Sequence, residues 1–135
     1  MQEQHNLSEN DKQLVKLACN HIKSRFDQDI ISIGAALRTK SGKIYTGINL
    51  KYHVSNICIC AESLAIYNAL DRGENELDTV VGVKYFPETN SFEVVNGCGK
   101  CRQLYCQNAP LKVILDNKGV LQSMNAEETL PLAFI

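Results

Sequence analysis

Gly97-Cys98-Gly99-Lys100-Cys101-Arg102-Gln103 decides how the rest of the chain is organised, because it places two thiols three positions apart directly after a glycine. Residues i and i+3 share one face of a helix, so a helix that starts at Cys98 aligns both thiols. Upstream, Cys60-Ala61-Glu62 supplies a third thiol and a carboxylate, 38 positions before the second segment. Both segments open predicted helices, over 60–70 and 98–106, and helix N-termini favour thiolates. The spacing therefore predicts that the two segments meet in one metal site.

The composition is that of an ordinary globular protein, and 135 residues are enough for a single domain over residues 1–135. Residues 1–6 are polar and contain no apolar signal core, and no apolar run is long enough to span a bilayer. We therefore expect no membrane partner and a cytoplasmic location, where thiols stay reduced. The net charge of −1, with no basic run, argues against nucleic acid as a partner.

Hydrophobic periodicity predicts helices and strands in the order α-β-β-α-β-β-α-β-β-α. The helices are expected over 8–26, 60–70 and 98–106, with a short last helix capped by Asn125, and the strands over 30–37, 43–50, 79–85, 91–95, 111–115 and 120–124. This order predicts one mixed sheet with helices on its faces. Small residues at 34–36 predict close packing against the first strand. An apolar tail follows Pro131, and a tail of that kind would seek a partner surface.

The three cysteines and the glutamate fit a catalytic zinc centre. Three thiolates leave one position of a tetrahedral zinc ion open, which is typical of catalytic rather than structural zinc. The open position lets the metal activate water, and Glu62 is then free to carry protons. Helix N-termini and Arg102 can offset the negative charge of the thiolates. A closed four-cysteine site with Cys58 as the fourth ligand remains the alternative, but it gives Glu62 no role.

These residues resemble the zinc-dependent cytidine deaminase family over nearly the whole chain, including its thiol-x-Glu and Cys-x-x-Cys zinc segments. The pattern is especially similar to the small bacterial blasticidin S deaminases. The motifs that carry the resemblance are Ile33-Gly34-Ala35-Ala36-Leu37, Gly47-Ile48-Asn49, Cys60-Ala61-Glu62, Cys98-Gly99-Lys100-Cys101-Arg102-Gln103 and Leu130-Pro131-Leu132-Ala133-Phe134.

The resemblance implies a three-layer α/β/α sandwich with a five-stranded mixed sheet. It implies Zn²⁺ as the cofactor, with Cys60, Cys98 and Cys101 as its ligands and Glu62 as the catalytic residue. It implies a homotetramer whose sites are completed by neighbouring subunits.

The resemblance also implies the contacts to substrate. Asn49 would bond the sugar, the backbone N–H of Ala61 would hold the pyrimidine carbonyl, and the carbonyl of Asn96 would receive the amine or departing ammonia. The implied reaction is the hydrolytic deamination of cytidine, deoxycytidine or blasticidin S to the uracil form. Two other functions stay open: deamination of another amino-heterocycle or modified cytosine, and a non-catalytic zinc protein with this fold.

Four positions depart from the family's pattern. Lys51 stands where nucleoside deaminases carry a glutamate that bonds a ribose hydroxyl, and Ser63 stands where an arginine is common. Asn96-Gly97 replaces Ser-Pro and predicts a looser loop, and an aromatic residue common near Ile31 is missing. An ammonium at position 51 favours a substrate with an anionic group, such as the carboxylate of blasticidin S or the phosphate of a nucleotide. The alternative is that Lys51 points into solvent.

Overall fold

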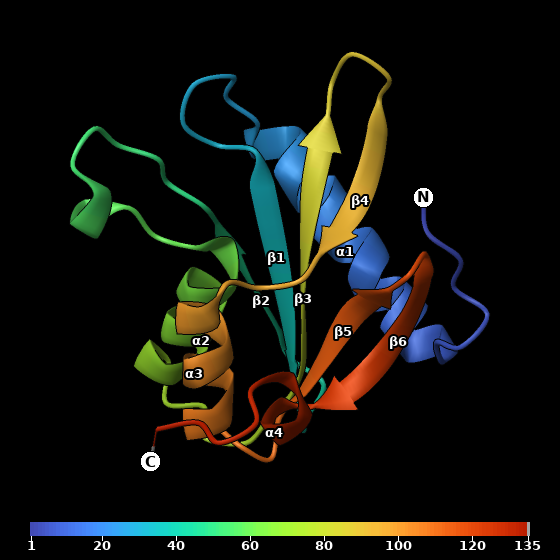
Figure 1. Cartoon of the computed structure of the whole chain (residues 1–135), viewed down its shortest axis with the longest axis vertical. Coiled ribbons are helices and arrows are strands. Elements are labelled where there is room, and N and C mark those ends of the chain that lie inside the picture. Colours follow the sequence, from blue (N-terminus) through green and yellow to red (C-terminus); the bar gives the residue numbers. More distant parts are fainter. Residues whose placement is uncertain (135) are drawn as a thin grey trace.

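A six-stranded mixed sheet carries the helices in this computed structural model, which describes residues 1–134 (Figure 1). Every predicted helix and strand is present, with ends shifted by up to three residues. The strands are β1 (Ile33–Thr39), β2 (Ile44–Ile48), β3 (Leu77–Phe86), β4 (Ser91–Val95), β5 (Lys112–Asn117) and β6 (Val120–Asn125). The helices are α1 (Glu9–Arg25), α2 (Ala61–Asp71), α3 (Gly99–Gln107) and α4 (Ala126–Thr129), with a 3₁₀ turn η1 (Ser55–Ile57) that was not expected.

Five of the strands follow one path, β2-β1-β3-β5-β6, and β4 adds a sixth to the five-stranded sheet that the resemblance implied. β5 runs parallel to β3 and pairs with it at Thr79 and Val80, whereas β4 runs antiparallel and pairs with it from Gly82 onward. Since β1 pairs with the other edge of β3 along the same residues, β4 and β5 occupy one edge of β3 in succession. β4 ends at Val95, beside the point where β5 takes over the pairing with β3, and the chain then enters the segment that precedes α3.

Helices cover both faces of the sheet, which gives the expected α/β/α sandwich. α1 packs on one face in a buried cluster with residues of β1, β3 and β5, while α2 and α3 lie side by side over the other face (Figure 1). Burial of these two apolar faces supplies most of the driving force for the fold. The close packing predicted at residues 34–36 is confirmed, because a Cβ at Gly34 would lie 2.7 Å from Cβ of Ile22 on α1.

The last residues run as an exposed tail beside α3. The side-chain amide of Gln103 bonds both the backbone N–H and the backbone carbonyl of Phe134. The side chains of Leu132 and Phe134 are nevertheless fully or largely exposed. The expected tail is thus present up to Phe134, and Ile135 lies outside the described residues.

Within residues 1–134, no helix is both long enough and apolar enough to cross a membrane.

Candidate active site

The two cysteine segments meet where α2 and α3 begin. Cys60 and Cys98 are the N-cap residues of these helices, and Cys101 lies in the first turn of α3. Cys98 Sγ lies 3.7 Å from Cys60 Sγ and 3.7 Å from Cys101 Sγ, and the three sulfur atoms all lie within 4.8 Å of one another. The structure therefore brings together the three thiols that the sequence placed 38 and three positions apart.

The spacing of these sulfur atoms suits a zinc ion. With Zn–S bonds of about 2.3 Å at tetrahedral angles, neighbouring thiolates stand about 3.8 Å apart. Two of the three sulfur–sulfur distances match this value closely. Three sulfur donors leave one tetrahedral position for a further ligand. Cys60 is half-buried and Cys98 is exposed, so solvent can reach the cluster.

The pKa values of the three thiols are shifted in different directions and by different amounts. Burial acts to raise the pKa of Cys98, but hydrogen bonds from the backbone of Cys101, from the thiols of Cys60 and Cys101 and from the backbone of Lys100 together outweigh it, so the pKa lies below its usual value. Burial raises the pKa of Cys60, and it raises that of the fully buried Cys101 far more. A cation is needed to hold all three sulfurs as thiolates together.

Glu62 stands directly beside this cluster. It lies in the first turn of α2, it is only 4% exposed, and its Oε2 is 3.8 Å from Cys101 Sγ. Burial raises the pKa of its carboxyl group above the usual value, and hydrogen bonds from its own backbone N–H and from Cys101 oppose this only in part. A raised pKa moves the carboxyl group towards the operating pH, which is the direction that favours a general acid–base residue.

The position of the Glu62 carboxylate depends on Gly82 in β3. A Cβ built on Gly82 would lie 2.0 Å from Oε1 of Glu62 and 2.8 Å from its Cδ. The carboxylate therefore lies against the bare backbone of β3. The sequence analysis missed this contact, although an isolated glycine inside a buried strand is a known sign of close approach by another group.

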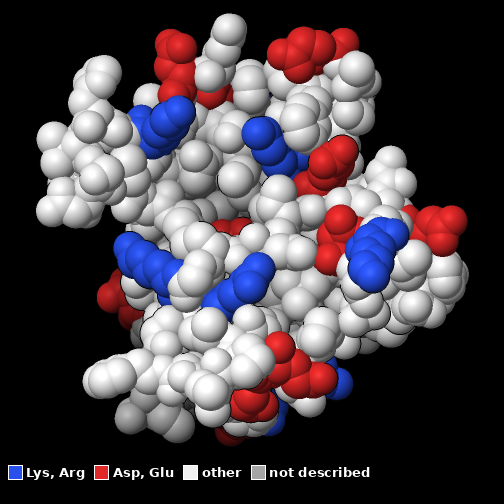
Figure 2. Space-filling model, viewed as in Figure 1, with Lys and Arg blue, Asp and Glu red and all other residues white. Residues whose placement is uncertain are grey.

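A cavity of about 530 Å³ opens over the cluster, a size typical of small-molecule sites. Its lining comes from the start of β1, the 49–62 segment and residues 95–100. The charged residues in this lining are Glu62, Lys51 and Lys100. Figure 2 shows a hollow near the middle of this face, with basic side chains around it and acidic atoms at its base.

The four predicted substrate contacts, Asn49, Lys51, Ala61 and Asn96, all line this cavity. Asn49 Oδ1 accepts hydrogen bonds from the backbone N–H groups of Ser32 and Ile33, both at 2.8 Å. Its NH₂ group donates one long hydrogen bond, of 3.5 Å, to the carbonyl of Ile30, which leaves its second hydrogen for a ligand. Ala61 is the first residue of α2, and a backbone N–H at that position has no acceptor within the helix. Within residues 1–134 the ammonium group of Lys51 forms no ion pair with a carboxylate.

The loop before α3 is held more firmly than the sequence suggested. The side chain of Asn96 exchanges two hydrogen bonds with the backbone of Asp116, at 2.8 and 3.0 Å. Arg102 Nε donates to the carbonyl of Gly97 at 2.8 Å. A Cβ on Gly97 would lie 2.7 Å from the hydroxyl oxygen of Tyr105. Gly97 thus packs closely against Tyr105, and these contacts anchor the loop that the glycine was expected to loosen.

Cys58 does not join the thiol cluster. Its Sγ accepts a hydrogen bond from the backbone N–H of Tyr52 at 3.2 Å and donates to the carbonyl of the same residue at 3.4 Å. The thiol thereby closes the loop that carries Lys51. The closed four-cysteine site is not the arrangement that the structure adopts.

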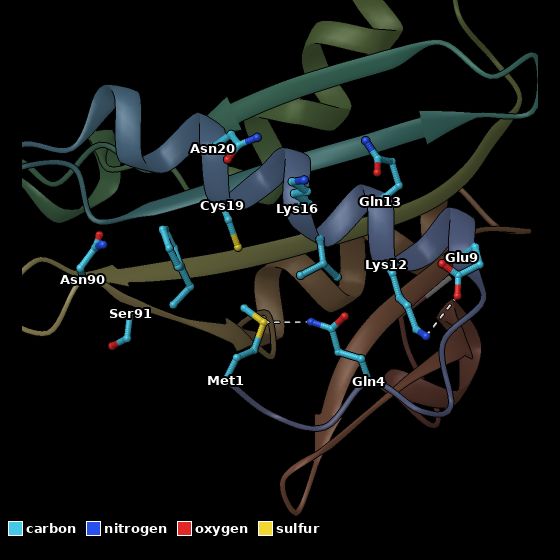
Figure 3. Close-up of a pocket in the computed structure, with 12 residues that line it drawn as sticks. Met1, Gln4, Glu9, Lys12, Gln13, Lys16, Cys19, Asn20, Asn90 and Ser91 are labelled. Atoms are coloured by element: carbon cyan, nitrogen blue, oxygen red, sulfur yellow. Dashed lines mark hydrogen bonds and ion pairs between the residues drawn. The ribbon is translucent and has the colours of Figure 1, made fainter.

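A larger cavity, of about 670 Å³, lies on another part of the surface (Figure 3). It runs between α1, the N-terminal segment and β4, and Cys19 is the thiol in its wall (Figure 3). Burial raises the pKa of Cys19 to about 11, so this thiol is not a nucleophile at neutral pH. Within residues 1–134, the one group of potential metal ligands is that of Cys60, Cys98 and Cys101, which makes the smaller cavity the candidate active site.

Comparison with known proteins agrees with this geometry. Residues 8–116 match the family model described as the cytidine and deoxycytidylate deaminase zinc-binding region. The chain is 34% identical over 133 residues to a blasticidin-S deaminase from Bacillus cereus, covering 96% of this chain and 95% of that protein. It is 33% identical over 105 residues to a cytidine deaminase from Halalkalibacterium halodurans, covering 76% of each.

Solved structures show the same fold. The cytidine deaminase from Burkholderia pseudomallei superposes with a TM-score of 0.73 at 27% identity, over 95% of this chain and all of that one. The enzyme from Bacillus anthracis gives a TM-score of 0.80 at 20% identity, over 93% of this chain and 90% of that one. The family model, the relatives and the fold agree, and the chain belongs to the zinc-binding cytidine and deoxycytidylate deaminase family.

Proposed function

We propose that this protein is a zinc-dependent aminohydrolase that converts the cytosine ring of a small nucleoside or nucleoside antibiotic to uracil and releases ammonia. The observation that carries the proposal is a buried carboxylate, Glu62, beside three clustered thiols at the base of a cavity of suitable size. A structural zinc site has no use for such a carboxylate, whereas hydrolysis of an amine needs a group that moves protons.

In this proposal Cys60, Cys98 and Cys101 would hold a zinc ion, which would supply a Lewis acid that makes water nucleophilic near neutral pH. Glu62 accepts a proton from the water and passes it to the ring nitrogen as the oxygen bonds to the amine-bearing carbon. Glu62 then takes the remaining proton from the oxygen now bonded to the ring carbon and delivers it to the amino group, which leaves as ammonia as the carbonyl forms. One water molecule is consumed, and the ring carbon exchanges its amino group for a carbonyl oxygen.

The substrate contacts inferred from the family can be made by the groups that line the cavity. The second hydrogen of the Asn49 NH₂, which is not directed to the carbonyl of Ile30, suits a hydroxyl or another acceptor on the sugar. The backbone N–H of Ala61 suits the pyrimidine carbonyl, and the carbonyl of Asn96 suits the leaving amine. The side chain of Asn96 is engaged with Asp116, which supports a role for its backbone rather than its amide.

The test of this function is ammonia release by the zinc-loaded protein across cytidine, deoxycytidine, cytosine, their monophosphates, blasticidin S and aminopurines. Turnover of a cytosine compound supports the proposal. Turnover of an aminopurine alone would point instead to another amino-heterocycle, and no turnover of any compound would favour a non-catalytic zinc protein. Survival of blasticidin S by cells that express the chain would extend the function to antibiotic resistance.

Lys51 is expected to favour substrates that carry an anion at the sugar end. Its ammonium lines the cavity without a carboxylate partner among residues 1–134, and Lys100 adds a second positive charge to the lining. We expect Lys51→Glu to lower kcat/KM for blasticidin S about 10-fold or more relative to cytidine, since the substituted carboxylate repels the substrate's carboxylate. Paired kcat/KM measurements on the two substrates give the ratio.

Lys118→Glu is the matched control, because it reverses a charge in the turn between β5 and β6, outside the lining of the active-site cavity. That variant should leave the ratio as in the wild type. An unchanged ratio in Lys51→Glu would mean that Lys51 points into solvent and does not select the substrate.

A homotetramer is part of the proposal. Apolar side chains stay exposed on the outer face of α2 and on the tail, namely Tyr67, Leu70, Leu132 and Phe134. Large apolar side chains left exposed on a monomer are candidates for an association surface. We expect sedimentation to give a mass close to four times that of the 15.1 kDa chain. A mass equal to one chain at micromolar concentration would contradict this prediction.

A cytoplasmic location is proposed for chemical reasons. All six cysteines are free, and three of them must stay reduced to bind a metal ion. Cell fractionation followed by immunodetection would test it, and recovery from an oxidising compartment would contradict it.

A further inference from the structure

Ser63 lies against the most deeply buried thiol of the cluster. It follows Glu62 in the first turns of α2, it is 1% exposed, and its Oγ is 3.6 Å from Cys101 Sγ. The sulfur itself has no exposed surface. This contact joins α2 to α3 directly behind the proposed zinc ligands.

The direction of this hydrogen bond is fixed once Cys101 binds a metal. A thiolate ligand has no proton to donate, so the sulfur can only accept and the Ser63 hydroxyl must donate. Glu62 Oε2, at 3.8 Å from the same sulfur, cannot donate while it is ionised. Arg102, which the sequence suggested as a counter-charge, directs its Nε to the carbonyl of Gly97 instead.

We propose that Ser63 is a positioning residue of the metal centre, donating a hydrogen bond to the Cys101 thiolate that strengthens zinc binding. The inference rests on the proposed function, in that it takes the three thiols as the zinc ligands. Three thiolates around a divalent cation carry a net negative charge, and the site offsets part of it with a neutral hydroxyl rather than with a buried cation. Groups that hydrogen-bond metal ligands orient them and tune the metal in this way.

Ser63→Ala tests the proposal without activity as the readout. Alanine removes one oxygen atom and has a high helix propensity, so the fold should be retained. We expect zinc affinity, measured by competition with a chelator, to fall about 10-fold. In the cobalt-substituted protein, the sulfur-to-cobalt charge-transfer band should move to longer wavelength, because a thiolate that loses a hydrogen bond releases its electrons more readily.

Thr79→Val is the matched control, because it also removes a buried hydroxyl, one that is hydrogen-bonded to Asp78 and Arg38. Thr79 belongs neither to the thiol cluster nor to the lining of the active-site cavity. It should leave zinc affinity and the cobalt band unchanged. Thermal unfolding of the metal-free proteins separates a general loss of stability from an effect on the metal.

Unchanged zinc affinity in Ser63→Ala overturns the inference, and so does weaker affinity with an unmoved cobalt band, which would indicate a packing role only. In both cases a wild type that binds zinc and releases ammonia leaves the proposed function standing. A wild type that binds no zinc overturns both.

Discussion

Glu62→Gln is expected to lower kcat about 10⁴-fold while the protein continues to bind zinc, because the proton carrier is lost and the three thiols remain. Glutamine has nearly the same size and shape as glutamate, so it can occupy the same buried space between α2 and β3. Its amide cannot accept a proton from water or return one to the ring. Steady-state kinetics on the preferred cytosine compound, with zinc content measured on the same sample, gives the comparison.

Glu127→Gln is the control for this prediction. Glu127 is exposed on α4, outside the lining of the active-site cavity, so the same chemical change there should leave kcat unaltered. Zinc-loaded Glu62→Gln with wild-type kcat would remove Glu62 from the mechanism. It would also revive the interpretation that the family fold serves binding alone in this protein.

Local signals in the sequence were sufficient for the helix starts and for the thiol cluster. Cys98 and Cys101 lie at i and i+3, and the structure begins a helix at each of the two predicted segments. The cap predicted at Asn125 is also present, and Glu128 completes a capping box with it. Such features involve residues within one turn of each other, so spacing and residue type are enough to predict them.

Contacts between distant segments were not predictable in the same way. The alternative with Cys58 as a fourth ligand could be excluded only from the structure, in which its thiol bonds the backbone of Tyr52 across a loop. The firm loop at Gly97 depends on Asp116 and Tyr105, which reach it only after β5 and α3 have packed. The division of one edge of β3 between β4 and β5 is likewise a matter of sheet pairing, which short-range patterns do not encode.

The same limit applies to the group that sets the position of Glu62. Gly82 lies 20 positions after Glu62, in an apolar run that by itself predicts only a buried strand. Its role becomes visible once α2 is placed on β3. Sequence could locate the chemical groups of this site, but the backbone surface on which they rest comes from the tertiary structure.

Gly82→Ala should therefore cost activity more than stability. The added Cβ would lie 2.0 Å from Glu62 Oε1, and the carboxylate at the end of a flexible side chain can move away more easily than the strand. We expect unfolding free energy to fall by about 1–3 kcal/mol, as for overpacked cores. We expect kcat to fall about 10²-fold or more, since a shift of the catalytic group by roughly 1 Å is enough for that loss. Denaturant unfolding and steady-state kinetics measure the two effects separately.

Gly99→Ala is the matched control, and we expect it to be harmless although Gly99 lies inside the Cys98–Cys101 segment. Gly99 lies between the two cysteines of the second metal segment, yet a Cβ there would meet no atom within 4 Å. We expect that variant to keep both its stability and its kcat, although it alters the metal motif itself. In a Glu62→Gln background, Gly82→Ala should lower kcat little further, because both changes disable the same group. Wild-type kcat in Gly82→Ala would show that the carboxylate can act from another position, and the bare backbone of β3 would then be a packing feature alone.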